Sequence, residues 1–129
     1  MTGVQTCALP IWACYVPSLD KIHLPRKDAF SSADGYYATA FHELAHWTGA
    51  KSRLDRDFSS RFGDDQYAFE ELVAEMSAAF LCQSHGIDAL TQHAAYVQSW
   101  VKVLKNDHKA IFKAAALAQK ATDYIRGEK

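Results

Sequence analysis

The order of apolar and polar positions along the chain predicts one short extended segment followed by helices. Between residues 13 and 25, apolar and polar residues alternate around Ile22 and Leu24, and Pro17 and Pro25 interrupt the run. This pattern predicts a short strand that is isolated or at the edge of a sheet. A turn-rich break of serine, aspartate and glycine follows at 31–35.

Helices are expected beyond this break, because apolar residues recur every three or four positions. The expected ranges are 36–47, 66–85, 88–104 and 109–125, and a polar, irregular loop joins the first two at 50–65. The residues expected to face inward on the last helix are Ile111, Ala115, Ala118, Thr122 and Ile125. The pattern therefore predicts an α+β fold that is mostly helical, with a short N-terminal strand segment and about four helices.

Composition narrows the class of protein. A chain of 129 residues suits one domain. Its net charge of −1 argues against non-specific attraction to nucleic acid. No apolar run is long enough to span a membrane. The cysteines are odd in number and lack metal-type spacing (Cys7, Cys14 and Cys82), which indicates reduced thiols and a cytoplasmic protein.

The first eleven residues need separate treatment. The stretch MTGVQTCALPI at 1–11 resembles translated sequencing-adapter read-through, and it lacks the basic start and apolar core of a signal peptide. We therefore expect 1–11 to be a non-native artefact and 12–129 to be the domain, with the natural chain continuing upstream of Trp12.

The clearest chemical signal is the segment FHELAHW at 41–47. His42 and His46 are separated by one helical turn, so their imidazoles can reach one Zn²⁺ ion. Glu43 lies next to that face, where it can accept a proton from a water that zinc acidifies. The alternative is a solvent-facing turn with incidental histidines, which the helical context disfavours.

A catalytic zinc needs a third protein ligand, and the second expected helix offers Glu70, Glu71 and Glu75. Glu71 and Glu75 share a helix face, so one can bind zinc while the other supports a ligand histidine. Glu70 points about 100° away and is expected to be a solvated charge.

The segments YYATAFHELAHWTG and YAFEELVAEMSAAFL resemble the zincin-like metallopeptidase domain of ArdC-type antirestriction proteins, the polyvalent-protein metallopeptidase family. The resemblance extends from Ala13 to Ile125 and implies a glutamate-zincin site. In such sites the third ligand begins an E-x-x-x-(D/N/E) motif, which makes Glu71 the ligand and Glu75 its supporting residue.

The same resemblance implies an origin on a plasmid, phage or other mobile element. Members of the family bind single-stranded DNA through a domain that precedes the peptidase domain. We expect that domain to be missing from this chain, and we therefore expect single-stranded DNA to bind only through the missing N-terminal domain and not to this chain.

Four further residues are weaker candidates. Arg53 and Arg56 lie in the loop between the ligand elements, where they could hold a substrate oxygen. A role in holding the loop through Asp55 and Asp57 is the more ordinary interpretation. His93 and Tyr96 could stabilise an oxyanion, although a packing role is the more ordinary interpretation.

The residues and the resemblance together predict a zinc metallopeptidase that cleaves a protein or peptide substrate with Glu43 as general base. The alternative is a zinc-containing binding protein that shields incoming DNA or occupies a host protein without turnover. A helical domain without metal is a third interpretation, and the HELAH segment argues against it.

Overall fold

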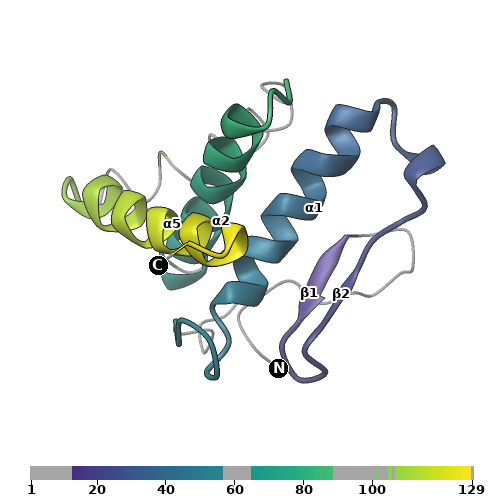
Figure 1. The fold of residues 1–129 in the computed structure, drawn as a ribbon. Coiled ribbons are helices and arrows are strands. Elements are labelled where there is room, and N and C mark those ends of the chain that lie inside the picture. The colour runs from purple at the N-terminus through teal and green to yellow at the C-terminus, as the bar shows by residue number, and fades with distance from the viewer. Residues whose placement is uncertain (1–12, 57–64, 89–100, 102–104, 106, 129) are drawn as a thin grey trace.

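The computed structural model describes residues 13–56, 65–88, 101, 105 and 107–128. In this part of the chain a two-stranded hairpin precedes helix α1, and helices α2 and α5 follow (Figure 1). α1 lies between the hairpin on one side and α2 on the other, and α5 packs against both α2 and α1. The mostly helical fold with a short N-terminal β segment is confirmed.

The N-terminal segment forms two strands where the sequence predicted one. β1 (Cys14–Val16) pairs antiparallel with β2 (Lys21–His23), with Tyr15 opposite Ile22. Between them Pro17 accepts a backbone hydrogen bond from Asp20, whose φ is 51°. Aspartate tolerates this left-handed conformation better than most residues, so the chain reverses inside the run that was expected to stay extended.

Helix α1 spans Ala33–Thr48, three residues earlier at its start than expected. Ser32 caps it, because its hydroxyl accepts a hydrogen bond of 3.0 Å from the amide of Gly35. A short 3₁₀ turn, η1 (Lys27–Ala29), precedes the cap. The buried face of α1 includes His42, Glu43 and His46, so the polar motif lies in the interior.

Helices α2 (Asp65–Ser84) and α5 (Ala110–Arg126) complete the core. The inward face of α5 consists of small residues, with Ala114, Ala118 and Ala121 fully buried. Small side chains allow two helix backbones to approach closely. α5 ends at Gly127, whose φ of 75° gives the left-handed turn common at helix ends.

The inward face of α5 agrees in part with the expected one, because Ala118 and Thr122 are buried as predicted. Ile111 was expected inside, but it is 40% exposed, while Ala110 and Ala114 are buried. Ala110, Ala114 and the partly buried Leu117 of α5 pack together with the α2 residues Ala68, Leu72 and Val73. The expected third helix at 88–104 lies almost entirely outside the described residues, although Val101 within it is helical.

Two further expectations can be compared with the described residues. Cys14 is disulfide-bonded, in contrast to the reduced thiols predicted from the sequence, whereas Cys82 is a free, buried cysteine. Among the described residues, no helix combines the length and apolar character required to cross a bilayer.

Candidate metal centre

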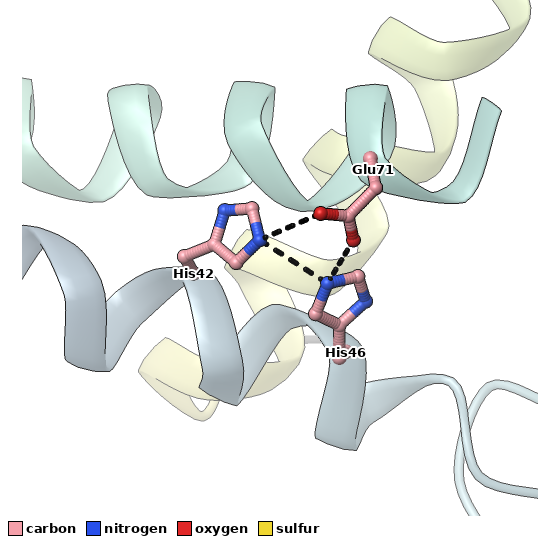
Figure 2. A group of neighbouring side chains, drawn as sticks. All are labelled: His42, His46 and Glu71. Carbon is pink, nitrogen blue, oxygen red and sulfur yellow. Dashed lines mark hydrogen bonds and ion pairs between the residues drawn. The ribbon is translucent and has the colours of Figure 1, made fainter. Parts of the chain in front are cut away.

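Three buried side chains from two helices meet at one point, and these are the ligands expected from the motif and the resemblance. His42 and His46 project from α1 toward Glu71 on α2 (Figure 2). The Nε2 atoms of the histidines lie 3.2 Å apart. Glu71 places one carboxylate oxygen 2.5 Å from Nε2 of His46 and the other 3.5 Å from Nε2 of His42.

The other ring nitrogen of each histidine contacts a different carboxylate. Nδ1 of His42 is 2.9 Å from Oε2 of Glu75, and Nδ1 of His46 is 2.8 Å from Oε2 of Glu70. A carboxylate accepts hydrogen bonds, so both Nδ1 atoms carry their protons and donate them. In this arrangement the lone pair of each imidazole is on Nε2, the atom that could bind a metal ion.

The chemistry of this donor set fits a metal cation. In their neutral forms, two imidazoles would direct lone pairs at one another across 3.2 Å, beside an ionised carboxylate. Such a cluster of electron-rich atoms is unfavourable unless a cation lies among them. Two imidazole nitrogens and one carboxylate are also the ligands of a catalytic zinc site with an open position.

The pKa values of His46 and Glu71 are shifted in the directions that favour a positive charge at the site. Burial alone would lower the pKa of His46, but the charge of Glu71 and hydrogen bonds to Glu70 and Glu71 raise it to about 9. Burial would raise the pKa of Glu71, but the charges of His46 and His42 hold it well below its usual range. Both shifts have the direction expected where carboxylates surround buried imidazoles, and such surroundings favour a positive charge between them.

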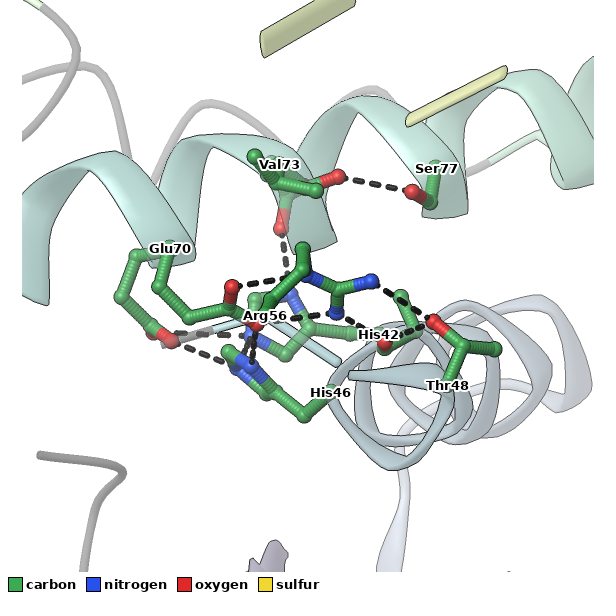
Figure 3. Close-up of polar contacts among 10 residues, drawn as sticks. His42, His46, Thr48, Arg56, Glu70, Val73 and Ser77 are labelled. Atoms are coloured by element: carbon green, nitrogen blue, oxygen red, sulfur yellow. Dashed lines mark hydrogen bonds and ion pairs between the residues drawn. The ribbon is translucent and has the colours of Figure 1, made fainter. Parts of the chain in front are cut away.

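The supporting carboxylate Glu70 is itself held by Arg56 (Figure 3). Nε and Nη2 of Arg56 donate to the two oxygens of Glu70 at 2.9 and 3.1 Å. Nη1 and Nη2 also donate to the Thr48 hydroxyl at 3.0 Å and to the Ala45 carbonyl at 2.5 Å. Arg56 thus joins the end of α1 to the start of α2 beside His46.

The expectation that Glu70 is a solvated charge is wrong. Glu70 is 5% exposed and bonds both His46 and Arg56. The helical period does direct Glu70 away from Glu71, but that direction on α2 is also buried. Its position directly before the candidate ligand Glu71 was the available signal, because a neighbour of one candidate ligand is well placed to contact another.

Glu43 and Arg53 occupy different surroundings. Glu43 is 7% exposed and forms no hydrogen bond or ion pair within the described part of the chain. Arg53 forms an ion pair with Asp20 and donates to the Trp47 carbonyl at 2.7 Å. Within the described residues both arginines thus hold the loop, Arg53 through Asp20 and Arg56 through Glu70, while Asp57 lies outside these residues. His93 and Tyr96 lie outside the described residues.

Comparisons with known proteins agree with this geometry. Residues 2–117 match the model of a zincin-like metallopeptidase family, MPTase-PolyVal. A DNA primase TraC of Escherichia coli is 55% identical over 114 residues, which cover 88% of this chain and 11% of that protein. The uncharacterized protein y4eC of Sinorhizobium fredii is 42% identical over 90% of this chain and 38% of its own length.

Two solved structures are also similar. The Mn(II)-bound structure of the antirestriction protein ArdC from plasmid R388 has a TM-score of 0.76 and 55% identity over 90% of this chain. Its metal-free structure has a TM-score of 0.72 and 56% identity. The chain spans 44% and 42% of these structures, respectively. Fold, site residues and family match together place this chain in the zincin-like metallopeptidase family.

Proposed function

We propose that this chain is a zinc-dependent metallopeptidase domain that hydrolyses peptide bonds. The observation that carries the proposal is the convergence of His42, His46 and Glu71 from two helices, with both histidine Nδ1 atoms held by carboxylates. An arrangement that fixes two imidazole tautomers in this way orients ligands for a metal.

Zinc is the proposed ion because of the ligand types. Imidazole suits zinc, whereas manganese is more typical of sites rich in carboxylate and carbonyl oxygens. The comparison structure of ArdC holds Mn(II), so manganese is the natural competitor in a binding experiment. A site with two nitrogen ligands and one carboxylate should bind zinc more tightly than manganese, as the general order of divalent-ion affinities also predicts.

The chemistry divides between the ion and the protein. Zinc supplies a Lewis acid that acidifies water and polarises the substrate carbonyl. Glu43 follows His42 directly on α1 and is directed about 100° from it, so it can accept a proton near the ion without binding it. Glu43 then returns the proton to the departing amine, while Glu70 and Glu75 keep the histidines oriented.

The substrate we propose is a protein or peptide encountered in the cytoplasm. The antirestriction function named for ArdC belongs to a longer protein, of which this chain matches less than half. We carry it over as a proposal: the peptidase would act for a plasmid, phage or other mobile element against a host protein. In this proposal, contact with single-stranded DNA is not a function of this chain.

The test pairs zinc content with cleavage in the wild type and in Glu43→Gln. The substitution keeps the size of the side chain but removes the base. We expect unchanged zinc and a loss of about 10²–10⁴-fold in hydrolysis of an unstructured protein such as casein. Full activity in Glu43→Gln would overturn the mechanism.

A second assay separates the enzyme from a binding protein. Protection of incoming plasmid DNA can be measured in a restricting host that expresses either the wild type or the Glu43→Gln variant. The peptidase proposal expects protection to be lost with cleavage. Protection that survives in a zinc-loaded Glu43→Gln would favour the non-catalytic alternative.

A further inference from the structure

Arg56 forms no hydrogen bond or ion pair with the proposed metal ligands, but it bonds Glu70, which in turn bonds His46. The side chains of Arg56 and Glu70 are each 6% exposed, and two hydrogen bonds join them. Glu70 uses Oε2 for both Arg56 and His46. One carboxylate oxygen therefore contacts both the guanidinium of Arg56 and the imidazole of His46.

The loop after α1 is folded so that the side chain of Arg56 reaches the Glu70 carboxylate. The Leu54 amide donates to the Thr48 carbonyl at 2.8 Å, and the Arg56 amide donates to the Gly49 carbonyl at 2.9 Å. Asp55 takes a left-handed conformation with φ of 54°. These bonds turn the chain back toward α1, and the guanidinium then bonds Ala45 and Thr48 in its last turn.

We propose that Arg56 is a positioning residue of the metal site, which acts through Glu70 to fix His46 and thereby raises the affinity for the metal. This inference rests on the metal site proposed above. Its physical basis is geometric and electrostatic: a planar guanidinium holds a carboxylate with two parallel bonds, and a buried carboxylate without such a partner is costly.

The charges around the site make a second contribution. Glu43, Glu70, Glu71 and Glu75 are all 7% exposed or less. Arg56 neutralises one of these carboxylates directly. Without it, the buried carboxylate of Glu70 would lose both of its guanidinium hydrogen bonds, and its Oε2 would no longer be fixed opposite Nδ1 of His46.

Arg53 offers a matched control in the same loop. Like Arg56, it is largely buried, pairs with a carboxylate and donates to a carbonyl in the last turn of α1. It stacks on the Trp47 ring with its guanidinium carbon 4.0 Å from the ring centroid. Its carboxylate, however, is Asp20 of the hairpin, which does not contact His42 or His46. A general loss of loop structure should therefore affect both arginine variants alike.

The experiment measures zinc affinity by competition with a chromophoric chelator in the wild type, Arg56→Met, Arg56→Lys and Arg53→Met. The free energy of unfolding of each metal-free protein is measured alongside. We expect Arg56→Met to lose about 10–100-fold in zinc affinity. Arg56→Lys should fall between it and the wild type, because lysine restores the charge but not the paired bonds. Arg53→Met should keep the wild-type affinity even where it lowers stability.

Cobalt provides a readout that a purely structural role would not change. The visible absorption bands of Co²⁺ bound in place of zinc report the geometry of its ligands. We expect these bands to shift in Arg56→Met and partly return in Arg56→Lys, and to remain unchanged in Arg53→Met. If Arg56→Met does not fold, the Arg56→Lys affinity and spectrum decide the matter.

The outcomes separate the two proposals. A wild type that binds zinc, with Arg56 variants of unchanged affinity and cobalt spectrum, would overturn the positioning role and leave the metal site intact. Equal losses in Arg56→Met and Arg53→Met, in proportion to stability, would also overturn it. A wild type that binds no zinc would overturn both this inference and the metal site.

Discussion

The Nε2 atoms of His42 and His46 face each other at 3.2 Å, while both Nδ1 atoms are held by carboxylates from the neighbouring helix. Two rings one helical turn apart on α1 would otherwise be free to rotate. Their fixed orientation comes from α2, which supplies Glu70 and Glu75 to the rings and Glu71 to the point between them. The site is therefore a property of the packed pair of helices.

Removal of one ligand should release the metal. His46→Ala takes away one of the two imidazole donors, so the variant should retain little of the roughly one zinc per chain expected for the wild type. Elemental analysis after dialysis checks this. His85→Ala is the control. His85 directly follows α2, and among the described residues its ring forms hydrogen bonds only with Leu81 and Ser84 of that helix. Equal zinc in the wild type and His46→Ala would contradict the assignment.

The three glutamates of α2 should differ in their effect on zinc affinity. Glu71→Gln removes the proposed ligand and should cause the largest loss. Glu70→Gln and Glu75→Gln each weaken the acceptor for one histidine, and losses of about 10–100-fold are typical of such partners. Chelator competition on the three variants checks the order. A Glu70→Gln protein with wild-type affinity would show that the Glu70–His46 hydrogen bond does not support the site.

The stabilisation from the ion pair between Asp20 of the hairpin and Arg53 should be lost in acid. Hydrogen bonds from Arg53 and then Tyr15 hold the pKa of Asp20 below its usual range. A carboxyl with a lowered folded pKa contributes stability that is complete above its unfolded pKa of about 3.9 and is lost as pH falls toward the folded value.

Urea unfolding of the wild type and Asp20→Asn at several pH values checks this. The stability difference between the two proteins should be present near neutral pH and shrink below about pH 4. Asp28→Asn is the control, because Asp28 pairs with Arg26 on the exposed surface and such pairs contribute little. A difference that does not vary with pH would exclude an ionised Asp20 as its source.

Binding of this chain to single-stranded DNA should be weak at physiological salt. The net charge is −1, and the exposed lysines near the start of α5 (Lys105, Lys109 and Lys113) have exposed Asp107 among them. Release of counterions from DNA needs several clustered cations. Fluorescence anisotropy with a labelled oligonucleotide measures the affinity, and a sub-micromolar value that falls steeply with salt would contradict this prediction.

The sequence alone was sufficient to place His42, Glu43 and His46. All three lie within one helix, where the period of 3.6 residues fixes which side chains share a face. Local signals also predicted α1, α2 and α5 to within a few residues. The choice of Glu71 over Glu75 as the third ligand required resemblance to a family, because helical spacing alone allows either carboxylate.

The tertiary structure decided the roles of Glu70 and Arg56, and the inward face of α5. The helical period gives the angle between Glu70 and Glu71, but it does not show what covers each direction. α2 packs against α1 on one side and against α5 on another. Glu70, which would be exposed if α2 had a solvent-facing side at this position, is therefore buried beside His46. Arg56 reaches Glu70 only through a loop whose fold depends on backbone bonds to α1, and sequence periodicity carries no record of such contacts.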